Sequence, residues 1–114
     1  MDFWERCEQL LSEHTVVIER PKGTTHPRYP ECVYPLDYGY LEGTSAGDAD
    51  AIDVWRGSMP VPRLVGIVCT VDMLKCDAEM KLLVGCSDDE MRTVEKFHNE
   101  NAHMSGIVVL REAT

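Results

Sequence analysis

The sequence lacks several features that would assign it to a common class. Its five cysteines include no C-x-x-C pair of the kind that zinc and dithiol redox sites use, so we expect reduced thiols in a cytoplasmic protein. No apolar run approaches the ~18 residues that a membrane-spanning helix requires. Charges at Asp2, Glu5 and Arg6 argue against a secretory leader at the start of the chain.

Cations are also scarce. The chain has 11 Lys plus Arg against 20 Asp plus Glu, a formal net charge of -9. Binding to nucleic-acid phosphates or to anionic lipids depends on local cations, so this balance argues against both partners. Any phosphate that the protein binds must be met by a few placed cations or by a metal ion.

The pattern of apolar residues predicts one domain over 1–114, with 44% hydrophobic residues to form a modest core. Repeats, linkers and low-complexity tracts are absent. We expect an amphipathic helix over 2–13, a strand over 15–20 that Pro21 ends, and an extended loop from there to residue 40.

After residue 50, strands and helices do not alternate regularly. Strands are expected at 52–55, 64–74, 81–84 and 106–110, and Ser87 with Glu90 forms a capping box that opens a helix to about residue 99. This order favours an α+β fold with a mostly antiparallel sheet or a small β-barrel, flanked by an N-terminal and a C-terminal helix. We interpret His14, His98 and His103 as surface or capping residues.

Three aspartates, Asp48, Asp50 and Asp53, lie within six residues. Each close pair would repel by about 1 kcal/mol at about 4 Å even in bulk water, so a cation is expected nearby. Oxygen ligands at this density suit Mg²⁺, Mn²⁺ or Ca²⁺. An EF-hand is excluded, because Asp53 stands where that loop needs glycine and Met59 where it needs glutamate. A solvated acidic loop is the alternative, but the neighbouring Ala49, Ala51 and Ile52 do not favour it.

Two other polar groups accompany this cluster. If 77–81 is a strand, Asp77, Glu79 and Lys81 share one face of it, which could equally be a solvated face. Upstream, Lys22, His26 and Arg28 form the densest cationic group of the chain, and the run from Tyr34 to Tyr40 offers phenolic hydroxyls to a phosphate.

Together these residues resemble the soluble, magnesium-dependent inorganic pyrophosphatases of the barrel-fold type. The family's tyrosine-rich motif is matched by Tyr34 to Tyr40, and its Asp-x-Asp-Pro-x-Asp signature follows at the same distance as Asp48, Asp50 and Asp53. The upstream Ile18-Glu19-x-Pro21 matches as well.

The resemblance implies a hydrolase that cleaves inorganic pyrophosphate with Mg²⁺, or with Mn²⁺ in its place, in cytoplasmic phosphate metabolism. It implies a homo-oligomer. By position, Asp50 is the general base, and the metal ligands are Asp48, Asp50, Asp53, Asp77 and Glu79. The substrate would contact Glu19, Lys22, Arg28, Tyr38 and Lys81, of which Lys22 and Arg28 are assigned only by analogy.

Several departures leave other functions open. Ala49 and Ala51 replace the signature's glycine and proline, the segment between Pro21 and Tyr34 is shorter than the family's hairpin, and a late Tyr-Lys phosphate contact has no match. If the family's glycine needs a positive φ, either Ala49 must bear strain or the loop must differ. The alternatives are a hydrolase of another small phosphoanhydride or nucleotide, and a non-catalytic protein that binds metal or phosphate.

Overall fold

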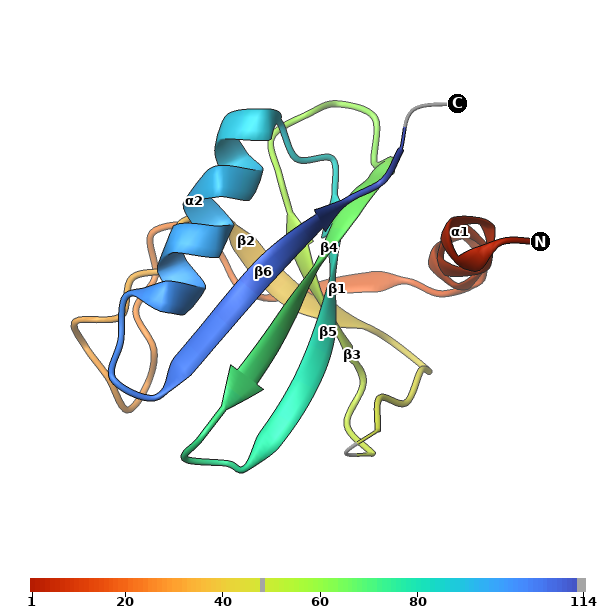
Figure 1. The fold of residues 1–114 in the computed structure, drawn as a ribbon. Helices are drawn as coiled ribbons and strands as arrows, with labels where there is room; N and C mark the ends of the chain where they lie inside the picture. Colours follow the sequence, from red (N-terminus) through yellow and green to blue (C-terminus); the bar gives the residue numbers. More distant parts are fainter. Residues whose placement is uncertain (48, 113–114) are drawn as a thin grey trace.

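The computed structural model describes residues 1–47 and 49–112. Its elements, drawn in Figure 1, are α1 (Phe3–Glu13), β1 (Val16–Arg20), β2 (Asp37–Leu41), β3 (Ile52–Arg56), β4 (Leu64–Asp72), β5 (Asp77–Val84), α2 (Asp88–Asn99) and β6 (Met104–Leu110). The predicted α+β class is confirmed. The predicted loop over 21–40 was wrong at its end, because the tyrosine-rich run forms β2.

The strands form one six-stranded sheet in the order β1-β2-β3-β5-β4-β6. Every neighbouring pair is antiparallel except β3 and β5, which run parallel. The sheet is mostly antiparallel as predicted, but it is not closed, so the expected barrel was wrong. Within the described residues β1 and β6 are its two edges. The two helices cover opposite apolar faces of the open sheet.

Both faces of the sheet carry a hydrophobic core because successive side chains of a strand point to opposite faces. Val54, Ile67 and Leu82 pack with Cys7 of α1 on one side. Their chain neighbours Trp55, Val68 and Leu83 pack with Met91 and Val94 of α2 on the other. The central strands are therefore continuous apolar runs, and polar residues such as Asp53 and Glu79 lie at their ends.

A capping box begins each helix. At α2 the Glu90 amide donates to Ser87 Oγ at 3.2 Å and the Ser87 amide donates to Glu90 Oε1 at 2.9 Å, as predicted. At α1, Asp2 and Glu5 exchange the equivalent bonds. Neither described helix is long and apolar enough to cross a bilayer.

His98 is buried at 4% exposure, so the predicted surface position was wrong. It joins α2 to the sheet, because Trp55 Nε1–H donates to His98 Nε2 at 3.1 Å. Burial, followed by the positive charge of Lys81, lowers the pKa of His98 to about 4. The ring is therefore neutral, with Nε2 as the acceptor and Nδ1 facing Met104 Sδ.

This histidine should make the protein sensitive to acid. In the unfolded chain it titrates near 6.5 and in the fold near 4, so the unfolded state binds the extra proton between those values. His98 stabilisation is complete above pH 6.5 and is lost as the pH falls, by about 3 kcal/mol at pH 4. Urea unfolding at pH 7, 5.5 and 4 would measure the decline.

His98→Gln is the matched control, because a glutamine oxygen can accept the Trp55 bond but does not titrate. We expect its free energy of unfolding to fall less steeply than that of the wild type over the same range. Parallel pH profiles for the two proteins would contradict the assignment.

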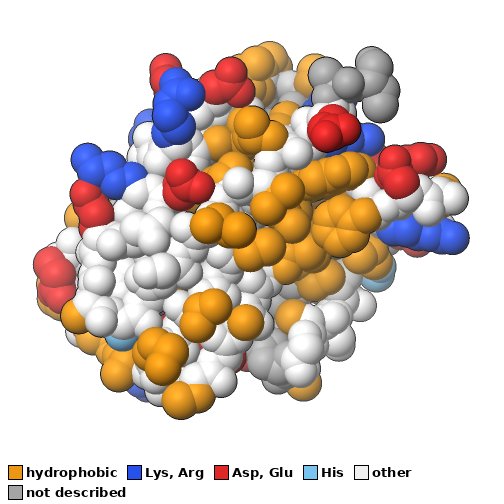
Figure 2. All heavy atoms as spheres, in the orientation of Figure 1, with side chains coloured by type: hydrophobic (Ala, Val, Ile, Leu, Met, Phe, Trp, Pro, Cys, Tyr) orange, Lys and Arg blue, Asp and Glu red, His pale blue; other side chains and the backbone are white. Residues whose placement is uncertain are grey.

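Apolar side chains also gather on the surface that carries β6, as Figure 2 shows. On this strand Ile107, Val109 and Leu110 are 62%, 39% and 59% exposed. In register with them, Cys69 faces Ile107 and Ile67 faces Val109, so Ile107 and Val109 continue the α1 side of the sheet, while Leu110 points to the opposite side. This apolar area is what remains of that side once α1 has covered the rest.

Candidate active site

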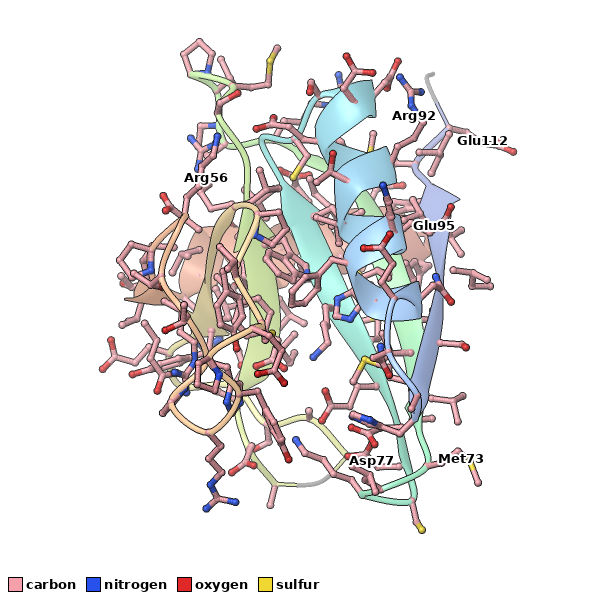
Figure 3. The ribbon with its side chains drawn as sticks, turned by 90° about the vertical axis from the view of Figure 1, so that its left-hand side faces the viewer. Arg56, Met73, Asp77, Arg92, Glu95 and Glu112 are labelled. Atoms are coloured by element: carbon pink, nitrogen blue, oxygen red, sulfur yellow. The ribbon has the colours of Figure 1, made fainter. Side chains whose placement is uncertain are left out.

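A cavity of about 350 Å³ lies between the 21–36 segment and the β4–β5 turn, next to the core that packs against α2. Met73 and Asp77 mark that turn in Figure 3, at the opposite end of the sheet from Arg56 and Arg92. Of the predicted site residues, those that line the cavity are Glu19, Tyr38, Asp50, Asp53 and Glu79. Residues distant in sequence thus meet at one place.

Strand register explains the meeting. Trp55 pairs with Tyr38 on β2 and with Leu83 on β5. Asp53, two residues before Trp55, shares its face of β3, and Lys81, two residues before Leu83, shares that face of β5. Asp53 and Lys81 therefore lie on the same face of the sheet as the buried Trp55 and Leu83.

Lys81 is the centre of this polar group. Its Nζ donates to Tyr38 Oη at 2.8 Å, to Asp53 Oδ2 at 2.7 Å and to Glu79 Oε2 at 2.8 Å. The Lys81 side chain is 5% exposed, against 29% for Asp53 and 18% for Glu79. An ammonium group has three protons, so these bonds use its whole donor capacity.

The charges are consistent with that geometry. Burial alone would lower the pKa of Lys81, but the attraction of Tyr38 and Asp53 and the bonds to the carboxylates outweigh burial and hold it above the usual range. The pKa of Tyr38 is raised, first by burial and then by Asp53 against the opposing effect of Lys81. Lys81 is therefore a permanent cation and Tyr38 a neutral hydroxyl at physiological pH.

An aromatic wall supports the tyrosine. The rings of Tyr34 and Tyr38 stack at 5.4 Å between centroids, and Tyr38 lies 4.5 Å from the indole of Trp55. Phe97 of α2 packs against both Trp55 and Tyr34, with ring centroids at 5.4 Å and 5.7 Å. The position of the phenol is thus fixed by the core.

The other predicted site residues lie elsewhere. Asp77 shares the face of Glu79 nearer the turn but does not line the cavity, and neither do Lys22 and Arg28. The Lys22 amide donates to Asp37 Oδ1, so this part of the chain serves to fix the segment after β1. The predicted metal ligand Asp48 lies outside the described residues.

Several cavity residues had not been predicted as site residues. Arg20, Lys75, His26 and Tyr34 also line it, as do the apolar Ala46, Ala51 and Met80; His26 and Tyr34 belong to the cationic group and the tyrosine-rich run of the sequence. Arg20 occupies the variable position of the Ile-Glu-x-Pro match, and Lys75 lies in a hairpin turn. The only sequence feature that could have identified Lys75 is its position, as a basic residue shortly before Asp77.

The donor chemistry fits a hard divalent cation. Asp50, Asp53 and Glu79 present only carboxylate oxygens to the cavity, and Mg²⁺ and Mn²⁺ prefer such ligands. In the described part of the chain no three acidic, histidine or cysteine side chains gather closely enough to hold a metal by themselves. The Lys81 ammonium instead lies between Asp53 and Glu79 as their counter-ion.

The aspartate loop also carries the strain that the sequence predicted. Ala49 has φ 72°, in the left-handed region where glycine is favoured. The left-handed conformation costs a residue with a Cβ about 1–2 kcal/mol. Ala49 therefore occupies a backbone conformation that a glycine would adopt without strain.

Ala49→Gly should consequently stabilise the protein. Relief of the strain, less the larger entropy of glycine in the unfolded chain, leaves about 0.5–1 kcal/mol, measurable by urea unfolding. Ala78→Gly is a matched control, since Ala78 lies in β5 and glycine should lower stability there by about 0.5–1 kcal/mol. Equal destabilisation by the two changes would contradict the strain at Ala49.

Comparison with known proteins places the fold. No family model and no curated protein matches the sequence. A solved structure described as an inorganic phosphatase of Anaplasma phagocytophilum is similar at a TM-score of 0.58 and 18% identity, covering 83% of this chain and 81% of that one. An inorganic pyrophosphatase of Coxiella burnetii is similar at 0.52 and 19%, covering 82% and 81%. The chain therefore has the fold of inorganic pyrophosphatases, as its motifs predicted.

Proposed function

We propose that the protein hydrolyses inorganic pyrophosphate to two phosphates with the help of bound Mg²⁺, or Mn²⁺ in its place. The observation that carries this proposal is the cavity in which Asp50, Asp53 and Glu79 lie with Tyr38 and with cationic side chains. A site with carboxylates and cations side by side suits a complex of a metal ion with a polyanion. The shared fold supports the same reading.

Each residue has a role in this proposal. Asp48, Asp50, Asp53, Asp77 and Glu79 would hold the metal, which when bound acts as a Lewis acid and lowers the pKa of a coordinated water. Asp50 accepts the proton as the water oxygen bonds to phosphorus and the bridging P–O bond breaks. Both phosphates then leave as separate products.

Tyr38 and Lys81 have different roles in this proposal. Tyr38 stays protonated, its oxygen accepts from Lys81 and its hydroxyl is hydrogen-bonded to Asp53, so it would donate to a phosphate oxygen when a metal ion engages that carboxylate. Lys81 is a positioning residue that holds Tyr38, Asp53 and Glu79 together. Glu19 forms the wall of the cavity beside β1.

A phosphate-release assay tests the function. We expect purified protein to release phosphate from pyrophosphate with magnesium and not after chelation. Nucleoside di- and triphosphates in the same assay test the alternative substrate class, which the short 21–36 segment favours. Binding of magnesium and pyrophosphate without turnover would instead support the non-catalytic alternative.

We also propose that the chain is a cytoplasmic homo-oligomer. The exposed apolar residues of the edge strand β6 support self-association, since covering the α1 side of this strand with a second copy removes Ile107 and Val109 from water. Sedimentation velocity would test the assembly, and a single species with the mass of one chain would contradict it.

A further inference from the structure

Two cations from different elements line the cavity without a carboxylate partner. Arg20 comes from β1 and Lys75 from the turn between β4 and β5. Among residues 1–47 and 49–112, neither forms an ion pair. What sets them apart from the other unpaired cations is that both line the cavity.

A β-bulge turns Arg20 toward the cavity. Ile18 pairs with Gly39 and Arg20 with Tyr38, which leaves Glu19 as an extra residue between the two pairs. Consecutive strand residues normally face opposite sides, but a bulge re-aims the side chains, and here Glu19 and Arg20 both reach the cavity. The Arg20 guanidinium lies over Tyr34, with Cζ 5.7 Å from the ring centroid.

Gly39 makes this arrangement possible. A Cβ on Gly39 would lie 1.8 Å from the carbonyl oxygen of Val17, so a side chain cannot fit where β1 and β2 approach. The glycine of the tyrosine-rich motif thus permits the close pairing that carries the bulge.

Lys75 is held by its turn. Asp72, which is 5% exposed, accepts from the Leu74 amide at 2.9 Å and the Lys75 amide at 3.2 Å through Oδ1. Cys76 completes the turn with φ 55°. The backbone of Lys75 is therefore fixed, while its exposed side chain can move toward a ligand.

The two cations converge on His26. Burial and the positive charges of Arg20, Arg28 and Lys75 all lower the pKa of this histidine. Its Nδ1 accepts from the Arg28 amide at 3.0 Å, so the neutral ring carries its proton on Nε2 and is a further donor at the cavity. Gathered cations repel one another, which an anion at this place would relieve.

We propose that Arg20 and Lys75 bind the phosphoryl oxygens of a phosphoanhydride, and that they supply the cations expected from Lys22 and Arg28. This inference rests on the proposed function. Lys81 is unsuited to the task, since all its donors are engaged. The site thereby selects substrates with at least two linked phosphoryl groups, long enough to reach both the cations and the carboxylates.

Calorimetric titration with imidodiphosphate, which has a P–N–P bridge in place of P–O–P, and magnesium tests binding separately from turnover. We expect Arg20→Gln and Lys75→Gln each to raise the Kd at least ~10-fold, as the loss of a charged hydrogen bond implies. Arg20→Lys should restore part of the affinity, and Lys96→Gln on the exposed side of α2 should leave the Kd unchanged. Thermal unfolding verifies that each variant is folded.

The outcomes separate the two proposals. Weaker binding by the Arg20 and Lys75 variants supports the inference even if the wild type releases no phosphate, a result that would overturn the proposed function alone. Unchanged binding by both variants, or a loss confined to Lys22→Gln and Arg28→Gln, overturns the inference while phosphate release by the wild type still supports the function. Failure of the wild type to bind imidodiphosphate overturns the inference as well.

Discussion

Replacing Asp50 with asparagine is expected to abolish magnesium-dependent phosphate release while the melting temperature stays nearly unchanged. Asparagine has the same shape but cannot accept the proton of an attacking water, and general base catalysis is worth about 10²- to 10⁴-fold. Asp50 lies exposed on the loop between β2 and β3, so the change leaves the core intact. The measurement is kcat with saturating pyrophosphate, beside a thermal unfolding curve.

A matched control is Asp89→Asn, which removes an exposed carboxylate from the first turn of α2 at the other end of the sheet. Its kcat should equal that of the wild type. Phosphate release by Asp50→Asn at the wild-type rate would exclude Asp50 as the base. A large fall in its melting temperature would show instead that the loop has a structural role.

Most of the secondary structure followed from local patterns. The capping box at Ser87 and Glu90 located α2, and apolar runs located β3 and β4 because buried strands need such runs on both faces. The strand β2 was not predicted because Pro35 and Gly39 are residue types typical of loops. In the fold Gly39 is instead required by the close approach of β1, a contact between strands that no local pattern specifies.

The site was predictable only where a motif fixed it. Tyr38 and Asp53 were identified from ordered motifs, and the structure brings them together through Lys81. Arg20 could not be identified, because an alternating strand would have placed it on the face opposite Glu19. The bulge places Arg20 on the cavity side instead. It arises from the pairing of β1 with β2, which the sequence alone does not specify.

The sheet could not be judged open or closed from its strands alone. A barrel closes only if the two edge strands pair with each other, and this depends on the curvature of the whole sheet. Here α2 packs over the β6 end and α1 over the opposite face, so much of the apolar surface on each side is buried without closure. The cavity lies beyond the part of the sheet that α2 covers, toward the β4–β5 turn.

Lys81→Met is expected to destabilise the protein by about 3 kcal/mol, since removal of one partner from a buried ion pair leaves the other charges uncompensated. Asp53 and Glu79 would then face each other without the ammonium that both contact, and the Tyr38 hydroxyl would lose a partner. Methionine fills most of the volume of the lysine stem, so the loss reports the charge and not a cavity. Urea unfolding at neutral pH gives the free energy.

Two comparisons isolate the electrostatic cause. Adding Asp53→Asn and Glu79→Gln to Lys81→Met removes the repelling charges and should recover part of the stability, a coupling that independent sites would not show. Magnesium should also raise the melting temperature of Lys81→Met more than that of the wild type, because a divalent cation can take the place of the ammonium between Asp53 and Glu79 and a ligand that binds only the fold stabilises it. If the triple variant were no more stable than Lys81→Met, and magnesium acted equally on both proteins, the lysine would be a packing residue. The carboxylates would then need another source of compensation.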